Sequence, residues 1–261
     1  MNRLNETVAV IADGVSEANS GFVDAFLQEG ATVIALSESH HDEVPAISKR
    51  DYADPSATDR LTLLDGDLSQ VNEVERMRDE ILDCFGQVDA VVASLNGRRQ
   101  NQPLVEVAPE SWRDALDSVL TTHFVLARTF LPVLAAQPDG GSYLFVNDPA
   151  CEMPDPHAGS SSVTAAGQRA LMETVAQEYY GNSTVRINEL DLPIPVSQPA
   201  SAGFESEEIT IEDIGQVAAT LSSRASEAHN EIIRLRNRSD IEAWMQSAHE
   251  PERTKQYVAE T

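Results

Sequence analysis

The chain has 261 residues, 18 of them basic and 43 acidic, which gives a formal net charge of −25 at pH 7. This length fits one large α/β domain or two small ones, and 41% hydrophobic residues are enough to bury a sizeable core. So negative a surface argues against partners such as nucleic acid and anionic membranes.

The acidic residues are spread along the whole chain, and Lys49 and Lys255 are the only lysines. This pattern is typical of halophilic proteins, which work at high internal salt where screening makes the self-repulsion tolerable. An ordinary acidic protein is the alternative. We expect no membrane span, no secretory signal and a cytoplasmic location, with Cys84 and Cys151 as free thiols rather than metal ligands.

Short apolar runs alternate with amphipathic stretches, which predicts a parallel sheet covered by helices. The predicted strands are Val8–Ala12, Thr32–Leu36, Leu61–Leu64, Ala90–Ser94, Tyr143–Asn147, Val185–Leu190 and Glu231–Leu235. The predicted helices between them are Asn19–Gln28, Val71–Phe85, Pro109–Ala136, Ser161–Tyr180 and Ile211–Ser222. The expected fold is therefore α/β, a doubly wound seven-stranded parallel sheet of the Rossmann type, in one domain over residues 1–238.

Three stretches depart from this alternation. Residues 37–60 are mostly polar and contain Pro45 and Pro55, so we expect mostly loop there. Residues 193–208 are rich in Pro, Ser and Gly and follow the sixth strand, a usual place for a loop that covers a substrate. Residues 239–261 are expected to form a short helix around Ile241, Trp244 and Met245, followed by a polar tail.

The first strand, turn and helix read VAVIADGVSEANSGFVDAFLQEGATVIAL. A dinucleotide-binding fold needs glycines in this turn, so that the turn is tight and the backbone can approach the pyrophosphate. The chain resembles the short-chain dehydrogenase/reductase family over nearly its whole length, and QEGATVIAL fixes the register without a gap. The family's T-G-x-x-x-G-x-G turn then places its threonine on Ala12 and its three glycines on Asp13, Glu17 and Asn19.

These replacements imply that the family's cofactor, NAD(P), is not bound in the usual way. A Glu17 carboxylate about 4 Å from a phosphate would cost ~4 kcal/mol at an effective dielectric of 20, and less in high salt. An acid or amide at the helix start is also expected to cap the helix in place of a phosphate. Gly14 and Gly21 lie at other positions and are expected to serve the turn and helix packing.

Other cofactor positions give a mixed result. The family's acidic residue for the adenosine ribose falls on Ser37, although Glu38 could take its place. Asp67, in DGDLSQ, is retained at the position that meets the adenine ring in the family. The N-N-A-G motif that ends the family's fourth strand is replaced by Ala93, Ser94, Leu95 and Asn96.

The resemblance places the family's catalytic residues on side chains that cannot perform their chemistry. The asparagine falls on Val119, the serine on Asp148, the tyrosine on Ser161 and the lysine on Ala165. Ser161 lacks the acidity of a phenol and Ala165 lacks the ammonium that lowers its pKa. Asp148 puts negative charge where an oxyanion would form, and Val119 cannot hold a proton-relay water. We expect no catalytic residues and a pocket repacked for stability.

Two other groupings could carry chemistry. Ser161 with His157, Cys151, Asp148 and Asp155 can be drawn as a nucleophilic set, and His40, His41, Asp42 and Glu43 as metal ligands. Neither spacing matches a known signature, and ordinary loop residues explain both, so no metal is expected.

The resemblance thus implies a catalytically inactive relative that is retained for association. Family members usually assemble through a pair of long helices, here Pro109–Ala136 and Ser161–Tyr180, and through the last helix and strand. Small residues on the second helix would allow close approach, although ordinary packing explains them equally well: Ala165, Ala166, Gly167 and Ala170. The expected partner is a second copy or an active relative. Two alternatives stay open: an oxidoreductase that uses NAD(P) in an altered mode, and a sensor of a less anionic small molecule.

Overall fold

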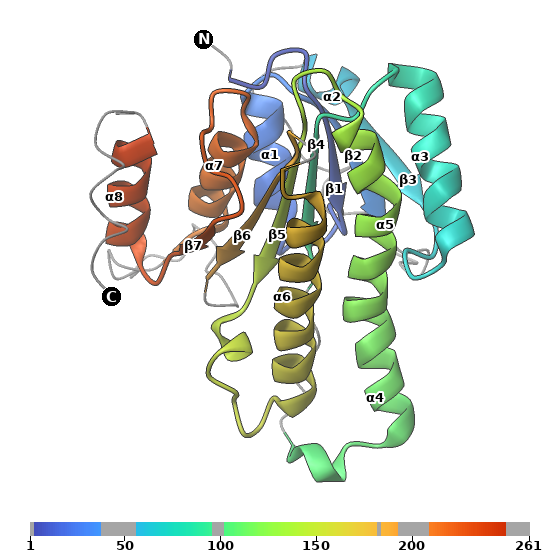
Figure 1. Cartoon of the computed structure of the whole chain (residues 1–261), viewed down its shortest axis with the longest axis vertical. Coiled ribbons are helices and arrows are strands. Elements are labelled where there is room, and N and C mark those ends of the chain that lie inside the picture. The colour runs from blue at the N-terminus through green and yellow to red at the C-terminus, as the bar shows by residue number, and fades with distance from the viewer. Residues whose placement is uncertain (1–2, 38–55, 96–101, 182–183, 193–208, 249–261) are drawn as a thin grey trace.

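The computed structural model describes residues 3–37, 56–95, 102–181, 184–192 and 209–248 (Figure 1). Seven parallel strands in the described part form one sheet in the order β3-β2-β1-β4-β5-β6-β7. The strands are β1 Val8–Ala12, β2 Thr32–Ser37, β3 Leu61–Asp65, β4 Ala90–Ser94, β5 Ser142–Asn147, β6 Arg186–Asp191 and β7 Ile232–Arg234. The predicted doubly wound fold is confirmed.

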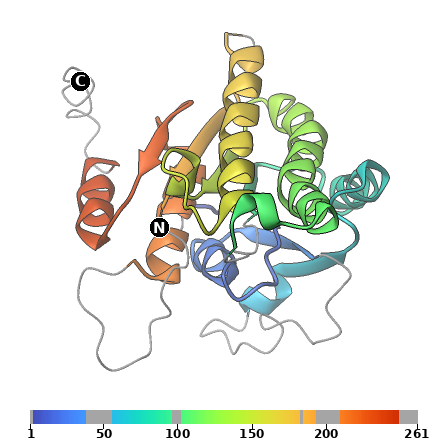
Figure 2. The ribbon, with the colours of Figure 1, turned by 90° about the horizontal axis from the view of Figure 1, so that it is seen from below.

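Helices cover both faces of the sheet (Figure 2). One core packs α1 and α7 against the sheet, and the other packs α3, α5 and α6. Both cores share β1, because Ala9 and Ile11 point to one side while Val10 and Ala12 point to the other. The helices are α1 Ser20–Gln28, α2 Ser56–Asp59, α3 Val71–Phe85, α4 Pro109–Ala115, α5 Thr122–Ala135, α6 Gly159–Tyr179, α7 Ile211–Ser222 and α8 Arg238–Ala248.

The predicted helix Pro109–Ala136 is not one regular helix. Between α4 and α5 lies a π-helical segment, η3, over Leu116–Thr121. The Thr122 hydroxyl donates to the Asp117 carbonyl at 2.9 Å, five residues back, which holds the widened turn. The stretch Pro109–Ala135 is long and apolar enough to span a membrane, yet 56% of its most apolar window is buried inside the protein, as in the core helix of a soluble fold.

Two glycines have the packing roles that the sequence predicted. A Cβ at Gly14 would lie 2.9 Å from the Ala35 Cβ, so the turn after β1 sits directly against β2. A Cβ at Gly21 would overlap the backbone carbonyl of Ile211, the first residue of α7. Gly215 of α7 approaches Gly21 in the same way, so the backbones of α1 and α7 are in contact.

The remaining differences from prediction are small shifts. β6 begins and ends one residue later than predicted and so includes Asp191, while β7 is shorter than predicted at both ends. α6 begins two residues earlier, and α2 occupies the end of a stretch that was expected to be mostly loop. The Pro-rich stretch 193–208 lies outside the described residues.

Candidate functional site

The candidate site is the edge of the sheet where the parallel strands end. Chain order reverses between β1 and β4, and in open α/β sheets ligands bind in the crevice at this point. Asp13 follows β1, Ser37 ends β2, Leu95 follows β4 and Asp148 follows β5.

The β1–α1 turn is closed by its own side chains. Asp13 has a φ of 51°, a left-handed conformation that glycine adopts easily and aspartate tolerates. The Asn19 side chain, 2% exposed, donates to the Asp13 carbonyl at 3.2 Å and to the Ser94 carbonyl at 3.0 Å. Asn19 therefore ties this turn to the end of β4 across the reversal point, while Glu17 is exposed.

The expectation that a side chain at this position caps α1 is wrong for Asn19. Asn19 has helix-like dihedral angles, and its side chain makes no capping hydrogen bond. Two successive tight turns precede Asn19: the backbone N–H of Ser16 donates to the Asp13 carbonyl, and the backbone N–H of Asn19 donates to the Ser16 carbonyl. These turns direct the side-chain amide of Asn19 toward the end of β4.

Ser37 and Asp67 have local structural roles. Ser37 is buried, and its carbonyl accepts from the Gly66 amide at 3.0 Å. The Asp67 carboxylate accepts from the amide and hydroxyl of Ser69 at 2.9 and 2.6 Å, which shapes the turn before α3. Glu38, the residues 40–43 and Asn96 lie outside the described residues.

The four positions on which the resemblance places the family's catalytic residues lie on α6 or on the segments next to it. Val119 is buried in η3, and η3 packs against α6. Asp148 accepts from the Ala150 amide at 2.7 Å and so caps the short helix η4, Pro149–Cys151. Ser161 lies half-buried near the start of α6. Ala165 is 4% exposed, and its carbonyl accepts from the Asn147 side chain at 3.2 Å. At these positions backbone groups and short side chains form hydrogen bonds with one another.

Next to these positions lies a cluster of charges that the sequence did not predict. We call it the arginine–carboxylate cluster: Arg169, Arg234, Arg236, Glu152, Glu189 and Asp191. At its centre the Arg169 Nε donates to both Glu189 oxygens at 2.9 Å, and its terminal nitrogen donates to Asp191 at 3.1 Å. Glu189 and Asp191 are 2% and 0% exposed. Both acids of β6 are thus buried against one guanidinium of α6.

The outer part of the cluster reaches solvent. Arg236 donates to the backbone and to the carboxylate of Asp191 at 2.9 and 3.1 Å. Glu152 accepts from Arg169 and from Arg234, and the hydrogen bond from Arg234 is the main reason why the Glu152 pKa lies below its ordinary value. Burial opposes the charge of Arg169, but the hydrogen bond and charge of Glu189 raise the Arg169 pKa above its ordinary value.

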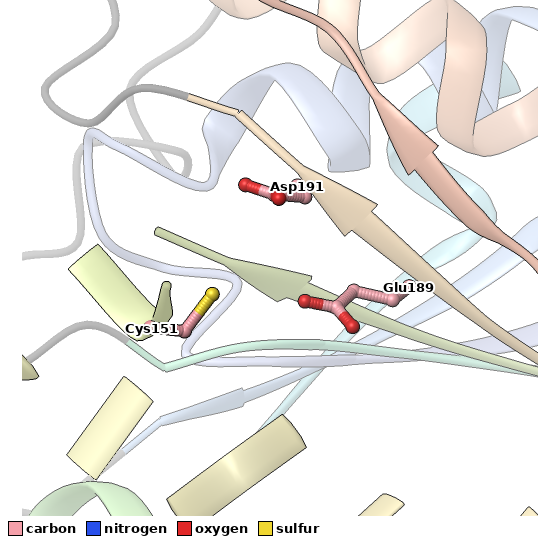
Figure 3. A group of neighbouring side chains, drawn as sticks. All are labelled: Cys151, Glu189 and Asp191. Atoms are coloured by element: carbon pink, nitrogen blue, oxygen red, sulfur yellow. The ribbon is translucent and has the colours of Figure 1, made fainter. Parts of the chain in front are cut away.

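Cys151 completes this region. Its sulfur and the carboxylates of Glu189 and Asp191 lie within 4.8 Å of one another (Figure 3), a spacing that a metal ion could use. However, Arg169 already holds both carboxylates, and burial raises the pKa of the Cys151 thiol to about 11. A protonated thiol and neutralised acids are poor ligands, so the charges favour an ion-pair cluster over a metal site.

The alternative nucleophilic set is not assembled around Ser161. The Asp155 carboxylate accepts from the backbone amide of His157 at 2.9 Å in a local turn, and His157 is exposed. The Cys151 thiol faces the acids of β6 instead.

Sequence signals for the cluster were present but indirect. The pattern Glu189-x-Asp191 puts two acids on one face of β6, and Arg234-x-Arg236 has the same spacing at the end of the neighbouring strand β7. Asp191 pairs with Arg234 in the sheet register. Buried acids need cationic partners, and that demand could have linked the two patterns.

Comparisons with known proteins agree with this architecture. Residues 19–230 match the family model described as enoyl-(acyl carrier protein) reductase. The 3-oxoacyl-[acyl-carrier-protein] reductase FabG of Thermotoga maritima is 25% identical over 71% of this chain and 73% of its own length. The Xenopus tropicalis dehydrogenase/reductase SDR family member 7C is 27% identical over 52% of this chain and 44% of its own length.

The chain spans about half the length of the first curated relatives that it matches, 44% and 53% in two cases. Among solved structures, the 3-ketoacyl-(acyl-carrier-protein) reductase from Brucella melitensis complexed with NADH superposes with a TM-score of 0.75. That superposition covers 89% of this chain and 98% of the other at 18% identity, which shows a shared fold.

Proposed function

Since the chain belongs to the short-chain dehydrogenase/reductase family, an oxidoreductase-like family, we propose that it is an inactive member. In this proposal it works as a structural or regulatory subunit and associates with itself or with an active relative. We further propose that it does so in a salt-rich cytoplasm, for which its net charge of −25 is the support.

The observation that carries the proposal is that the site has no free cation and no acidic hydroxyl at the positions where the family resemblance places them. Ala165 and Ser161 offer no cation and no acidic hydroxyl for proton transfer. The nearest cation on α6, one turn after Ala165, is Arg169, and its guanidinium is held by Glu189 and Asp191. A reaction that develops negative charge on a carbonyl oxygen would find the carboxylates of Glu189 and Asp191 here, and the Arg169 guanidinium already bonded to both.

Cofactor titration tests the loss of nucleotide binding. In molar KCl we expect no saturable binding of NADH or NADPH up to about 1 mM, that is, a binding free energy weaker than about −4 kcal/mol. The triple variant Asp13→Gly, Glu17→Gly, Asn19→Gly is expected to gain measurable affinity, because it removes the Glu17 carboxylate and the Asn19 amide from the turn. Submillimolar binding by the unchanged chain would overturn the proposal.

The proposed association uses the outer face of α5 and α6, which lie side by side (Figure 1). Phe124 of α5 is 49% exposed and Val163 of α6 is 41% exposed, and Ala166 and Ala170 continue the same face. Not all four small residues of α6 contribute, since Ala165 is buried and a Cβ at Gly167 would meet Leu120 within the chain. The exposed face is apolar and shallow enough for helices of a partner.

Light scattering on a size-exclusion column tests this face. We expect a dimer or larger assembly in molar salt, and monomers for the double variant Phe124→Asp, Ala170→Arg. The matched control is Phe85→Asp, because Phe85 is 37% exposed at the C-terminal end of α3 and is not part of the α5–α6 face. A monomeric unchanged chain, or equal dissociation by the control, would refute the role of this face.

A second candidate function is an oxidoreductase that uses NAD(P) in an altered mode. It is favoured by the backbone of Asp13, which keeps the left-handed conformation suited to the family's glycine. The relative from Brucella melitensis, which was solved with NADH, gives the same fold-level support. The titration above distinguishes the two candidates.

A further inference from the structure

His123 of α5 lies at a junction of three elements and has no role in the site described above. The imidazole is wholly buried and stacks on Tyr143 of β5, with ring centroids 5.8 Å apart and planes inclined by 10°. The ring of Phe145, also on β5, lies 5.4 Å away. Gln168 of α6 is the polar neighbour on the remaining side, and its amide donates to the Leu95 carbonyl at 3.4 Å.

These buried polar groups do not satisfy one another. Among the described residues, both imidazole nitrogens, the Tyr143 hydroxyl and the Gln168 side-chain oxygen lack a hydrogen-bond partner of good geometry. Burial lowers the pKa of His123 to about 4, and the neighbouring Gln168 opposes only part of this shift. The neutral imidazole therefore packs as an aromatic ring, and its protonated form would carry an unpaired charge inside the core.

The elements packed around His123 bring no counter-charge to it. β4 and β5 contain no charged residue, and Tyr143 is the titratable group on β5. Arg128 of α5 is exposed and pairs with Glu75 of α3 at 2.9 Å. Arg169 of α6 pairs with Glu189 in the arginine–carboxylate cluster, and Asp117 of η3 is exposed. Protonation of His123 is thus possible at ordinary acidity only when the ring reaches water.

We propose that His123 is an acid-sensitive latch, which holds α5 and α6 on β5 while neutral and releases this helix pair locally when it takes up a proton from solvent. The release begins next to η3, whose π-helical hydrogen bonding ends at Thr121, two residues before His123. If the protein assembles through the α5–α6 face, as the proposed function holds, acid would also dissociate the oligomer.

Hydrogen exchange of the full chain in molar salt tests the latch. An opening that exposes one histidine with an ordinary pKa of 6.5 becomes about tenfold more favourable per pH unit below 6.5. Between pH 6.5 and 4.5 we therefore expect protection of α5 and α6 peptides, corrected for the intrinsic rate, to fall about fortyfold, because the exposed histidine is already half protonated at pH 6.5 and the buried one begins to titrate near pH 4. Peptides of α1 and β2 should lose less, because the opening is local.

The control is His123→Leu, which fills this position with an apolar side chain that cannot titrate. Carboxylates titrate in both chains, so the difference between them isolates His123. We expect α5 and α6 of this variant to lose protection no faster with acid than α1 and β2. Equal acid sensitivity of the two chains, or uniform loss along the unchanged chain, would refute the latch.

A measurement on the unchanged chain covers the case in which His123→Leu does not fold. Deuterium exchange at the imidazole C2 carbon reports the pKa of each histidine. We expect slow exchange at His123 and a pKa of about 4. A pKa near 6.5 for His123 would overturn the proposal by itself.

Discussion

Replacing Arg169 with alanine is expected to lower the free energy of unfolding by about 3–5 kcal/mol, because an uncompensated buried charge is left behind. Glu189 and Asp191 would remain almost fully buried without the guanidinium that now bonds to both. Thermal unfolding in molar salt should show a midpoint lower by roughly 10 °C for a chain of this size. A loss below 1 kcal/mol would show that Arg236, or protonation of the acids, already compensates their charge.

Two comparisons isolate the cause. Arg234→Ala removes an arginine that is 47% exposed and bonded to the exposed Glu152, so the cost should stay below about 1 kcal/mol. The triple variant Arg169→Met, Glu189→Leu, Asp191→Leu removes the buried charges together, and it should recover most of the stability lost in Arg169→Ala. If it does not, packing by the arginine stem rather than charge compensation explains the first result.

The fold could be predicted because most of its determinants are local. β1 and β4 were predicted with their observed bounds, since each is a continuous apolar run buried on both faces. β6 was displaced by one residue because Asp191 does not look like a buried strand residue. Its burial depends on Arg169 and Arg236, which lie 22 residues before it and 45 residues after it in the chain.

The site was less predictable because its partners are distant in sequence. The family register located Asp148, Ser161 and Ala165, but it could not show that Arg169 would bind Glu189 and Asp191. Asn19 has a residue type that favours a helix cap, yet its amide bonds to Ser94, 75 residues away. In both cases a tertiary partner overrides what the local sequence favours.

A second large effect is expected where α1 and α7 meet. Gly21→Ala should destabilise the fold by about 3 kcal/mol, because overpacking that displaces backbone costs more than a side-chain adjustment. The new Cβ would overlap the Ile211 carbonyl, so the two helices must separate. Alanine gains about 1 kcal/mol over glycine in a helix, and that gain only partly offsets the loss. Chemical denaturation in molar salt measures the difference.

Gly167→Ala is the matched control, since it makes the same change inside α6. There the Cβ would lie 3.0 Å from a terminal methyl of Leu120, a flexible side chain that can move. Its net effect should lie within about 1 kcal/mol of zero, because helix propensity and crowding oppose each other. Equal losses at Gly21 and Gly167 would contradict the argument. A selective loss at Gly21 would show that the close backbone contact between α1 and α7 stabilises the fold.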